Sequence, residues 1–204
     1  TSTGDSNNKE EKESSKQVQI NVTSSPGKWI REIGSDVAKG SIVLESGTTI
    51  GPAEMALLAS LGQVKVVVRK KPIVGVMSTG DELVDATSES PSEWKIRDSN
   101  RPMLLAAAGT ARAEILDLGI APDEKDKLQN AIKNALKKVN ILITSGGVSM
   151  GSHDLVKPLL NQMENATLHF GRVRMKPGKP TTFASLNDGK MFFALPGNPV
   201  SSLV

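Results

Sequence analysis

Ile141-Leu-Ile-Thr144 is a short apolar run, and Ser145-Gly-Gly-Val-Ser-Met-Gly-Ser-His-Asp154 follows it directly. An apolar run of this length that stops at glycine is typical of a buried strand leading into an open turn. Similar runs occupy 73–77 and 114–118, and helix-like segments separate all three. This β-α-β-α-β alternation predicts an α/β fold, with a mostly parallel sheet and helices on both faces.

The composition narrows the class of protein. The 204 residues are 38% hydrophobic but only 3% aromatic, which favours the aliphatic core of a helix-covered parallel sheet. The net charge of +3, from 25 basic and 22 acidic residues, is too balanced to predict a nucleic-acid groove. The chain has no cysteine, so disulfides and zinc–thiolate sites are excluded and a cytoplasmic location is expected. No apolar stretch approaches the ~20 residues of a membrane span, and the N-terminus lacks the pattern of a secretory signal.

Three segments are expected along the chain. Residues 1–16 are polar and without periodicity, so a disordered tail is predicted. Residues 17–71 predict a partial subdomain that is rich in β-strands and contains one helix, which starts at Pro52. Residues 72–204 form the predicted α/β domain, whose last helix is cut off at Val204.

The expected strands are 17–22, 29–33, 41–44 and 64–68 in the subdomain, then 73–77, 114–118, 141–144, 168–173, 182–186 and 191–195 in the domain. Three helices are expected in the domain. The first is capped by Ser99 and runs to about Ala108, and the second is 124–138 with Asp123 as its N-cap. The third lies near 155–163 and begins around Lys157, with Pro158 at its first position.

Loops that follow parallel strands lie at one edge of the sheet, and ligands bind there. The loops after the expected strands are small, polar or glycine-containing: 78–82, 119–123, 145–154, 175–180 and 196–201. One such loop means little, but five at one edge predict a binding site. For the glycine segment 145–151, two interpretations stay open. Its backbone N–H groups cradle a phosphate, or the glycines serve only a tight turn that needs positive φ.

The acidic side chains of these loops suggest a metal. Asp81, Glu82, Asp123 and Asp154 supply the oxygen ligands that Mg²⁺ prefers. The alternatives are that Asp123 only caps a helix and that Asp81 is only a turn residue. Asp154 is the stronger metal candidate, because it closely follows three glycines.

A second group is basic: Arg172, Arg174, Lys176 and Lys179 lie close together with no acid between them. Arg172 and Arg174 would share one face of a strand. The two lysines are held in a Pro-Gly-Pro frame that restricts the backbone, so the loop predicts a seat for an oxyanion. The alternative is a solvated cationic edge that discourages aggregation between strands.

Five motifs carry a family resemblance. They are Ser78-Thr-Gly-Asp-Glu-Leu83, Arg97-Asp-Ser-Asn-Arg101, Ser145-Gly-Gly-Val-Ser-Met-Gly151 with Asp154, Lys176-Pro-Gly-Lys-Pro180 and Leu195-Pro-Gly-Asn-Pro-Val-Ser201. They occur in this order in the molybdopterin molybdenumtransferases, which include a bacterial enzyme, the E domain of a plant protein and the C-terminal domain of gephyrin. Upstream, Pro26–Arg31, Gly34–Asp36 and Gly51–Glu54 also resemble the family, so the resemblance covers roughly residues 26 to 204.

The resemblance implies a reaction and a set of residues. The family takes adenylylated molybdopterin and molybdate, releases AMP and yields molybdenum cofactor, with a divalent metal assisting. By motif, the implied catalytic residues are Asp123 and Asp154, and Mg²⁺ would be bound by Asp123, Asp154 and Glu82. The implied molybdopterin and nucleotide residues are Thr79, Gly80, Asp81, Glu82, Asp98, Asn100, Ser145, Gly146, Gly147, Ser149, Gly151, Pro196, Asn198 and Pro199. The implied molybdate residues are Arg172, Lys176, Lys179, Pro180 and Ser201.

The chain departs from the family in two ways. Pro122 stands where many relatives have arginine, and most of an N-terminal elongated region and a C-terminal β domain are missing. We therefore expect the chain alone to be an incomplete catalyst, and the full-length protein to be a homodimer. Two other functions stay open. One is a gephyrin-like scaffold with receptor or cytoskeletal partners, and the other is a related molybdopterin adenylyltransferase.

Overall fold

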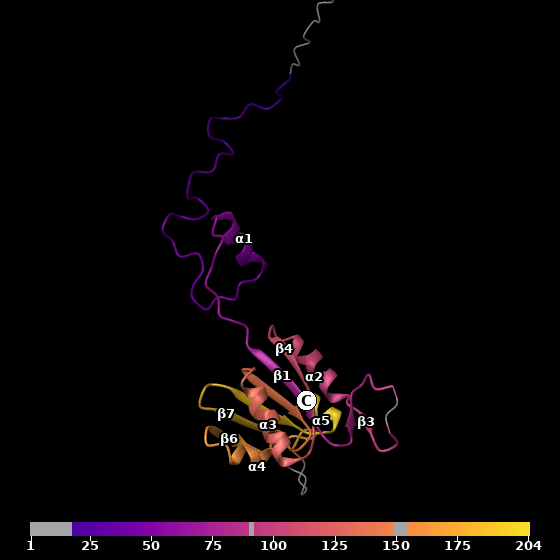
Figure 1. Cartoon of the computed structure of the whole chain (residues 1–204). Coiled ribbons are helices and arrows are strands. Elements are labelled where there is room, and N and C mark those ends of the chain that lie inside the picture. The colour runs from indigo at the N-terminus through magenta and orange to yellow at the C-terminus, as the bar shows by residue number, and fades with distance from the viewer. Residues whose placement is uncertain (1–17, 90–91, 149–154) are drawn as a thin grey trace, which may run out of the picture. The chain divides into compact units, whose positions relative to one another are not determined.

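The computed structural model describes residues 18–89, 92–148 and 155–204. The chain divides into two compact units, Thr1–Val67 and Val68–Val204 (Figure 1). The sequence places a boundary close to this division, after Lys71. The predicted tail 1–16 lies outside the described residues.

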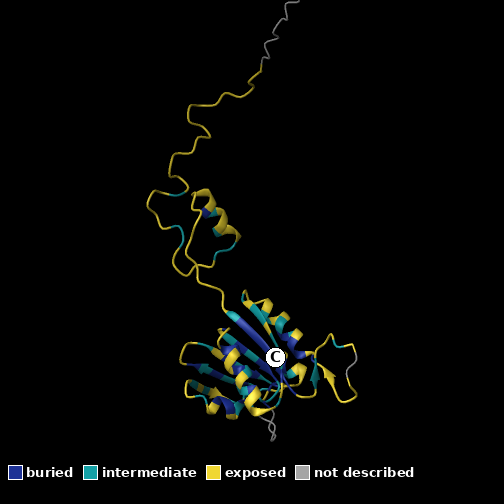
Figure 2. Cartoon of the chain, viewed as in Figure 1, coloured by how far each residue is buried: buried dark blue, intermediate teal, exposed yellow. Residues whose placement is uncertain are grey.

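The first unit contains helix α1, Pro52–Ser60, where the sequence predicts it. Glu54 stabilises its start, because the backbone N–H of Gly51 donates to Glu54 Oε2 at 2.8 Å. The predicted β-rich character is wrong, since residues 18–72 contain no strand. Figure 2 shows most of this segment as exposed, and Ile20 and Val67 are typical. Alternating apolar residues favour a strand only when a second strand accepts and donates their backbone hydrogen bonds, and this segment pairs with none.

The second unit is built on a six-stranded sheet. Its strands, in chain order, are β1 Ile73–Thr79, β4 Glu114–Ala121, β5 Ile141–Ser145, β6 Ala166–Phe170, β7 Thr182–Leu186 and β8 Met191–Leu195. In space the order is β4-β1-β5-β8-β7-β6, and a small separate pair is formed by β2, Leu83–Val84, and β3, Ile96–Arg97. The pairs β1–β4, β1–β5 and β5–β8 are parallel, whereas β7 runs antiparallel to both β8 and β6. The predicted, mostly parallel α/β fold is thus confirmed.

Helices cover both faces of this sheet, as predicted (Figure 1). They are α2 Asn100–Gly109, α3 Lys125–Leu136, α4 Val156–Asn161 and α5 Pro199–Leu203. The main core lies between the sheet and α3 with α4, where Leu128, Ile132, Leu142, Leu159 and Phe192 are almost fully buried. On the other face, α2 packs against β1 and β4, and α5 lies beside α2. Within the described ranges, no helix is long and apolar enough to cross a membrane.

Several predicted boundaries change by a few residues, and three of these changes bear on the site or on a cap. β6 ends at Phe170 rather than at Val173, because the following residues turn away into a loop. The N-cap of α3 is Glu124 and not Asp123, since the Glu124 carbonyl accepts the first helical bond, from the N–H of Leu128 at 2.8 Å. α4 begins at Val156, so Pro158 lies in its first turn, where proline needs no hydrogen-bond acceptor.

Candidate functional site

The five predicted site loops follow strands that point in the same direction. β4, β1, β5 and β8 are parallel, and β6 shares their direction because β7 is antiparallel to both of its neighbours. The carboxyl ends of these strands therefore meet at one edge of the sheet, which is where open α/β sheets bind ligands. We call this edge the strand-end site.

The glycine turn after β5 packs tightly against the end of β1. Gly146 has φ +94°, and a Cβ at this position would lie 2.5 Å from the backbone oxygen of Thr79. Its N–H donates to the carbonyl of Leu195 at 3.0 Å, which ties the turn to the end of β8. Glycine is thus required here both by conformation and by space. Ser149, Gly151 and Asp154, predicted in the same loop, lie outside the described residues.

Acidic residues from two strand ends come together. The backbone N–H of Asp123, after β4, donates to Asp81 Oδ1, after β1, at 3.1 Å. Glu82 follows Asp81, and its carboxylate lies within 2.8 Å of where a Cβ on Gly80 would stand. These oxygens have the chemistry that a hard cation prefers. In the described parts of the chain, no three His, Cys, Asp or Glu residues group as a metal site, so the set with Asp154 stays a prediction.

Asp98 and Asn100 lie behind the loops rather than on their surface. Asp98 is 1% exposed, and its oxygens accept hydrogen bonds from Ser78 Oγ at 2.9 Å and from Arg101 N and Nε at 3.1 and 3.0 Å. Asn100 is 8% exposed and donates through Nδ2 to Ser145 Oγ at 2.6 Å and to the Gly197 carbonyl at 2.8 Å. Both residues therefore join the start of α2 to strand ends.

Arg101 forms ion pairs with three carboxylates, and the sequence analysis assigned it no role. Its guanidinium is buried and bonds Asp98, Asp85 and Asp117. Burial lowers the pKa of Arg101, but the hydrogen bonds to the three carboxylates outweigh it and raise the pKa above its ordinary value. Burial raises the pKa of Asp117, but hydrogen bonds from Arg101 and from the N–H of Gly119 outweigh it, so the pKa of Asp117 lies below its ordinary value. The sequence did contain a sign of this ion pair, because Asp98 stands three positions before Arg101 at the start of a helix, a spacing that brings opposite charges together.

Asp85 is the most strongly shifted carboxyl of this group. Hydrogen bonds from the hydroxyl and the backbone N–H of Thr87 contribute most, followed by the bond from Arg101, and they lower the pKa of Asp85 to about 2. Asp85 comes directly after β2, so its bond to Arg101 attaches the segment with β2 and β3 to α2.

The basic loop, residues 171–181, connects β6 to β7 at the same edge. The N–H of Val173 donates to the carbonyl of Lys179 at 2.9 Å, which closes the loop on itself. Gly178 is buried, and a Cβ added at this position would lie 3.4 Å from the backbone oxygen of Ser201 in α5. Lys176 and Lys179 are exposed, so the structure brings a basic loop and Ser201 together.

Other predicted residues are placed as follows. Arg172 and Arg174 lie after the end of β6, in the loop, so the prediction that they share one face of a strand is wrong. Pro180 is half-buried in the same loop. Asn198 caps α5, accepting from the N–H of Ser201 at 3.2 Å, and Pro199 is the first residue of that helix. Pro196 is buried and its carbonyl accepts from Ser202 Oγ.

The buried polar atoms without a hydrogen-bond partner within the described structure include Thr79 Oγ1, Asn100 Oδ1 and Thr144 Oγ1, all near the strand ends. Such atoms are rare in folded proteins, because each costs free energy when it is taken out of water. Sequence reasoning missed Thr144, since nothing in an apolar run marks one threonine as lacking a partner.

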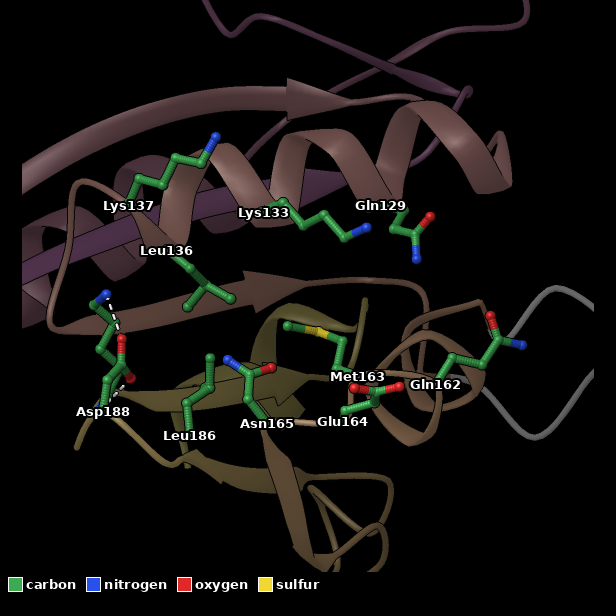
Figure 3. Close-up of a pocket in the computed structure, with 11 residues that line it drawn as sticks. Gln129, Lys133, Leu136, Lys137, Gln162, Met163, Glu164, Asn165, Leu186 and Asp188 are labelled. Carbon is green, nitrogen blue, oxygen red and sulfur yellow. Dashed lines mark hydrogen bonds and ion pairs between the residues drawn. The ribbon is translucent and has the colours of Figure 1, made fainter.

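A cavity of about 490 Å³ lies away from these loops (Figure 3). Its walls come from α3, from residues 162–165 and from the β7–β8 turn. Lys133 of α3 lies across it from Glu164, and Lys190 forms an ion pair with Asp188 at 2.6 Å. None of the predicted site residues lines this cavity.

Comparisons with known proteins agree with this architecture. The family model described as a probable molybdopterin binding domain matches residues 75–204, and a model of the MoeA N-terminal region (domain I and II) matches residues 3–62. Gephyrin of Dictyostelium discoideum is 46% identical over 92% of this chain and 29% of its own length. A molybdopterin molybdenumtransferase of Haemophilus influenzae is 41% identical over 88% of this chain and 43% of its own.

Solved structures give the same result. The molybdopterin biosynthesis MoeA protein from Pyrococcus horikoshii is 32% identical, with a TM-score of 0.68 over 82% of this chain and 40% of its own. A molybdenum cofactor biosynthesis protein B shares the fold at 16% identity and a TM-score of 0.50, over 67% of this chain and 86% of its own. The chain spans less than half the length of the two curated relatives above. Because the first family model covers well over half of its residues, the chain belongs to the family of probable molybdopterin-binding domains.

Proposed function

We propose that the protein containing this chain inserts molybdenum into molybdopterin. It would take adenylylated molybdopterin and molybdate, break the adenylyl–phosphate link, release AMP and yield molybdenum cofactor. Relatives named molybdopterin molybdenumtransferase, at 41% and 43% identity, support this reaction class. The observation that carries the proposal is the strand-end site, where a basic loop and a glycine turn follow strands of the same sheet edge.

The basic loop is the proposed molybdate seat. Lys176 and Lys179 are exposed and carry positive charge on a loop closed by a backbone hydrogen bond. Ser201 lies next to this loop and offers a hydroxyl, while Arg172 and Pro180 belong to the loop itself. A doubly charged oxyanion is bound best by fixed cations together with hydrogen-bond donors.

The phosphate groups are assigned to the glycine turn. Gly146 and Gly147 carry no side chain that would keep a phosphate away from the backbone. Thr79 lies against this turn from the end of β1, and Gly80 follows it, so the substrate would lie across the ends of β1 and β5. Ser149 and Asp154 remain predicted contacts of the same loop.

We assign Mg²⁺ to the acids of this edge. Glu82 and Asp123, with Asp154 as the further predicted ligand, would hold the ion, because carboxylate oxygens are the ligands that it prefers. When bound, Mg²⁺ neutralises phosphate charge and polarises the bond that breaks.

The test is AMP release by the full-length protein with adenylylated molybdopterin, molybdate and Mg²⁺, followed by chromatography. We expect Lys176→Ala to slow AMP release at limiting molybdate by about tenfold or more, because a charge-assisted contact to the oxyanion is lost. Lys138→Ala, an exposed lysine beyond the end of α3, is the matched control and should have no effect. Absence of AMP release by the unmodified protein would reject the proposal. Consumption of ATP with unadenylylated molybdopterin would assign an adenylyltransferase instead.

A further inference from the structure

We infer that Asn100 is a positioning residue, which holds the glycine turn after β5 and the Pro-Gly loop after β8 at a fixed separation. The resemblance implies that Asn100 contacts the cofactor. The geometry points instead to a residue that acts through the two loops. The catalytic consequence rests on the proposed function, whereas the structural consequence can be measured without it.

The orientation of the Asn100 amide is settled by its partners. A backbone carbonyl can only accept a hydrogen bond, so the group that faces the Gly197 carbonyl at 2.8 Å must be the NH₂ group. The same nitrogen lies 2.6 Å from Ser145 Oγ. Both N–H bonds of the side chain are therefore used within the protein, one at the end of β5 and one on the loop after β8.

The remaining polar atom of Asn100 does not reach the surface. Its Oδ1 is buried and has no hydrogen-bond partner in the described structure, and the residue as a whole is 8% exposed. In the described structure, neither the oxygen nor the nitrogen of this side chain is open to a ligand. Asn100 thus affects a ligand through Ser145 and Gly197.

Hydrogen bonds of the neighbouring residues fix the position of Asn100. It is the first residue of α2, between Asp98 and Arg101, and these two are joined through Arg101 N and Nε at 3.1 and 3.0 Å. Asp98 also accepts from Ser78 Oγ at the end of β1, at 2.9 Å. The start of α2 is therefore fixed to β1, and Asn100 extends that attachment to β5 and β8.

The two segments that Asn100 joins also contact each other directly, and Ser145 Oγ donates to the Pro196 carbonyl at 3.4 Å. The N–H of Gly146 donates to the Leu195 carbonyl at 3.0 Å, so the exchange of this amide with solvent reports whether the loops stay together. In Asn100→Leu, which keeps the approximate shape and removes both donors, we expect the Gly146 amide to exchange about tenfold faster. Ser145→Ala removes one of the two Asn100 contacts and the long 3.4 Å bond to the Pro196 carbonyl, but it leaves the Asn100 bond to Gly197, so it should give a smaller increase at the same amide.

Hydrogen exchange of the full-length protein, followed by mass spectrometry, tests this with Asn130→Leu as the control, since Asn130 is exposed on α3. A faster exchange confined to the ends of β5 and β8 supports the inference. Unchanged exchange at Gly146, or an equal increase throughout the sheet, overturns it.

Kinetics supply the second measurement. In Asn100→Leu, a displacement of the loops by up to about 1 Å should lower kcat for AMP release by about ten- to a hundredfold. The KM should change by less than about threefold. A raised KM with kcat unchanged would make Asn100 a ligand contact and overturn the inference. If the unmodified protein releases no AMP, the proposed function fails, and the exchange experiment still decides the role of Asn100.

Discussion

Replacing Arg101 by methionine tests whether the buried ion cluster stabilises the second unit. In Arg101→Met, the Asp98 carboxylate, which is 1% exposed, loses the guanidinium nitrogen that donates to it at 3.0 Å. Removing one partner of a buried ion pair costs about 3–5 kcal/mol. Asp98 keeps its bonds from Ser78 Oγ and from the backbone N–H of residue 101, which keeps the loss at the lower end of that range. Asp85 and Asp117 are about half exposed, so their pairs with Arg101 add little.

We therefore expect the free energy of unfolding to fall by about 3 kcal/mol, measured by urea denaturation of the full-length protein at neutral pH. The double variant Arg101→Met/Asp98→Asn removes the stranded charge and should recover at least about 1 kcal/mol. Arg69→Met, at an exposed position, should change stability by less than about 0.5 kcal/mol. A loss below about 1 kcal/mol in the single variant, or no recovery in the double variant, would refute the reasoning.

Three further predictions concern single positions. Thr144→Val removes a buried hydroxyl that has no partner in the described structure, so it should raise the free energy of unfolding by about 1 kcal/mol, and a loss of stability would contradict this. Gly146→Ala, whose new Cβ would stand 2.5 Å from a backbone oxygen, should cost about 3 kcal/mol in denaturation, against about 1 kcal/mol for Gly189→Ala, which has positive φ but open space. The folded pKa of Asp85, about 2, lies below its ordinary 3.8, so its stabilising contribution is complete above 3.8 and is lost as pH falls through about 2. Thr87→Ala removes the largest cause, so NMR titration should show the pKa of Asp85 moving up toward 3.8.

The sheet could be predicted because its signals are local. Strands 182–186 and 191–195 have the predicted bounds, since apolar runs there are separated by the turn residues 187–189. The helix after Gly51 was also predictable, from proline at its first position and Glu54 in its first turn. These features depend on neighbours in sequence, so they can be recognised without knowing what packs against them.

The parts that sequence reasoning missed depend on partners far along the chain. Alternating residues near Ile20 look like a strand, but no strand pairs with them. Arg101 and Asp117 are far apart in sequence, and only the packing of α2 on β4 brings them together. Asp123 looked like a helix cap because it stands one residue before the true cap, and such shifts of one or two residues are common at helix ends.

The reversed direction of β7 has a consequence for how this protein can change. Both ends of the basic loop are attached to adjacent strands of one hairpin, so the loop needs no crossover helix to return to the sheet. Its length and charges can vary while the parallel strands and their helices stay as they are. The segment between β6 and β7 is therefore a part of the chain that can be replaced as a unit. Exchanging it between relatives would test the proposed role of the loop in binding molybdate without rebuilding the fold.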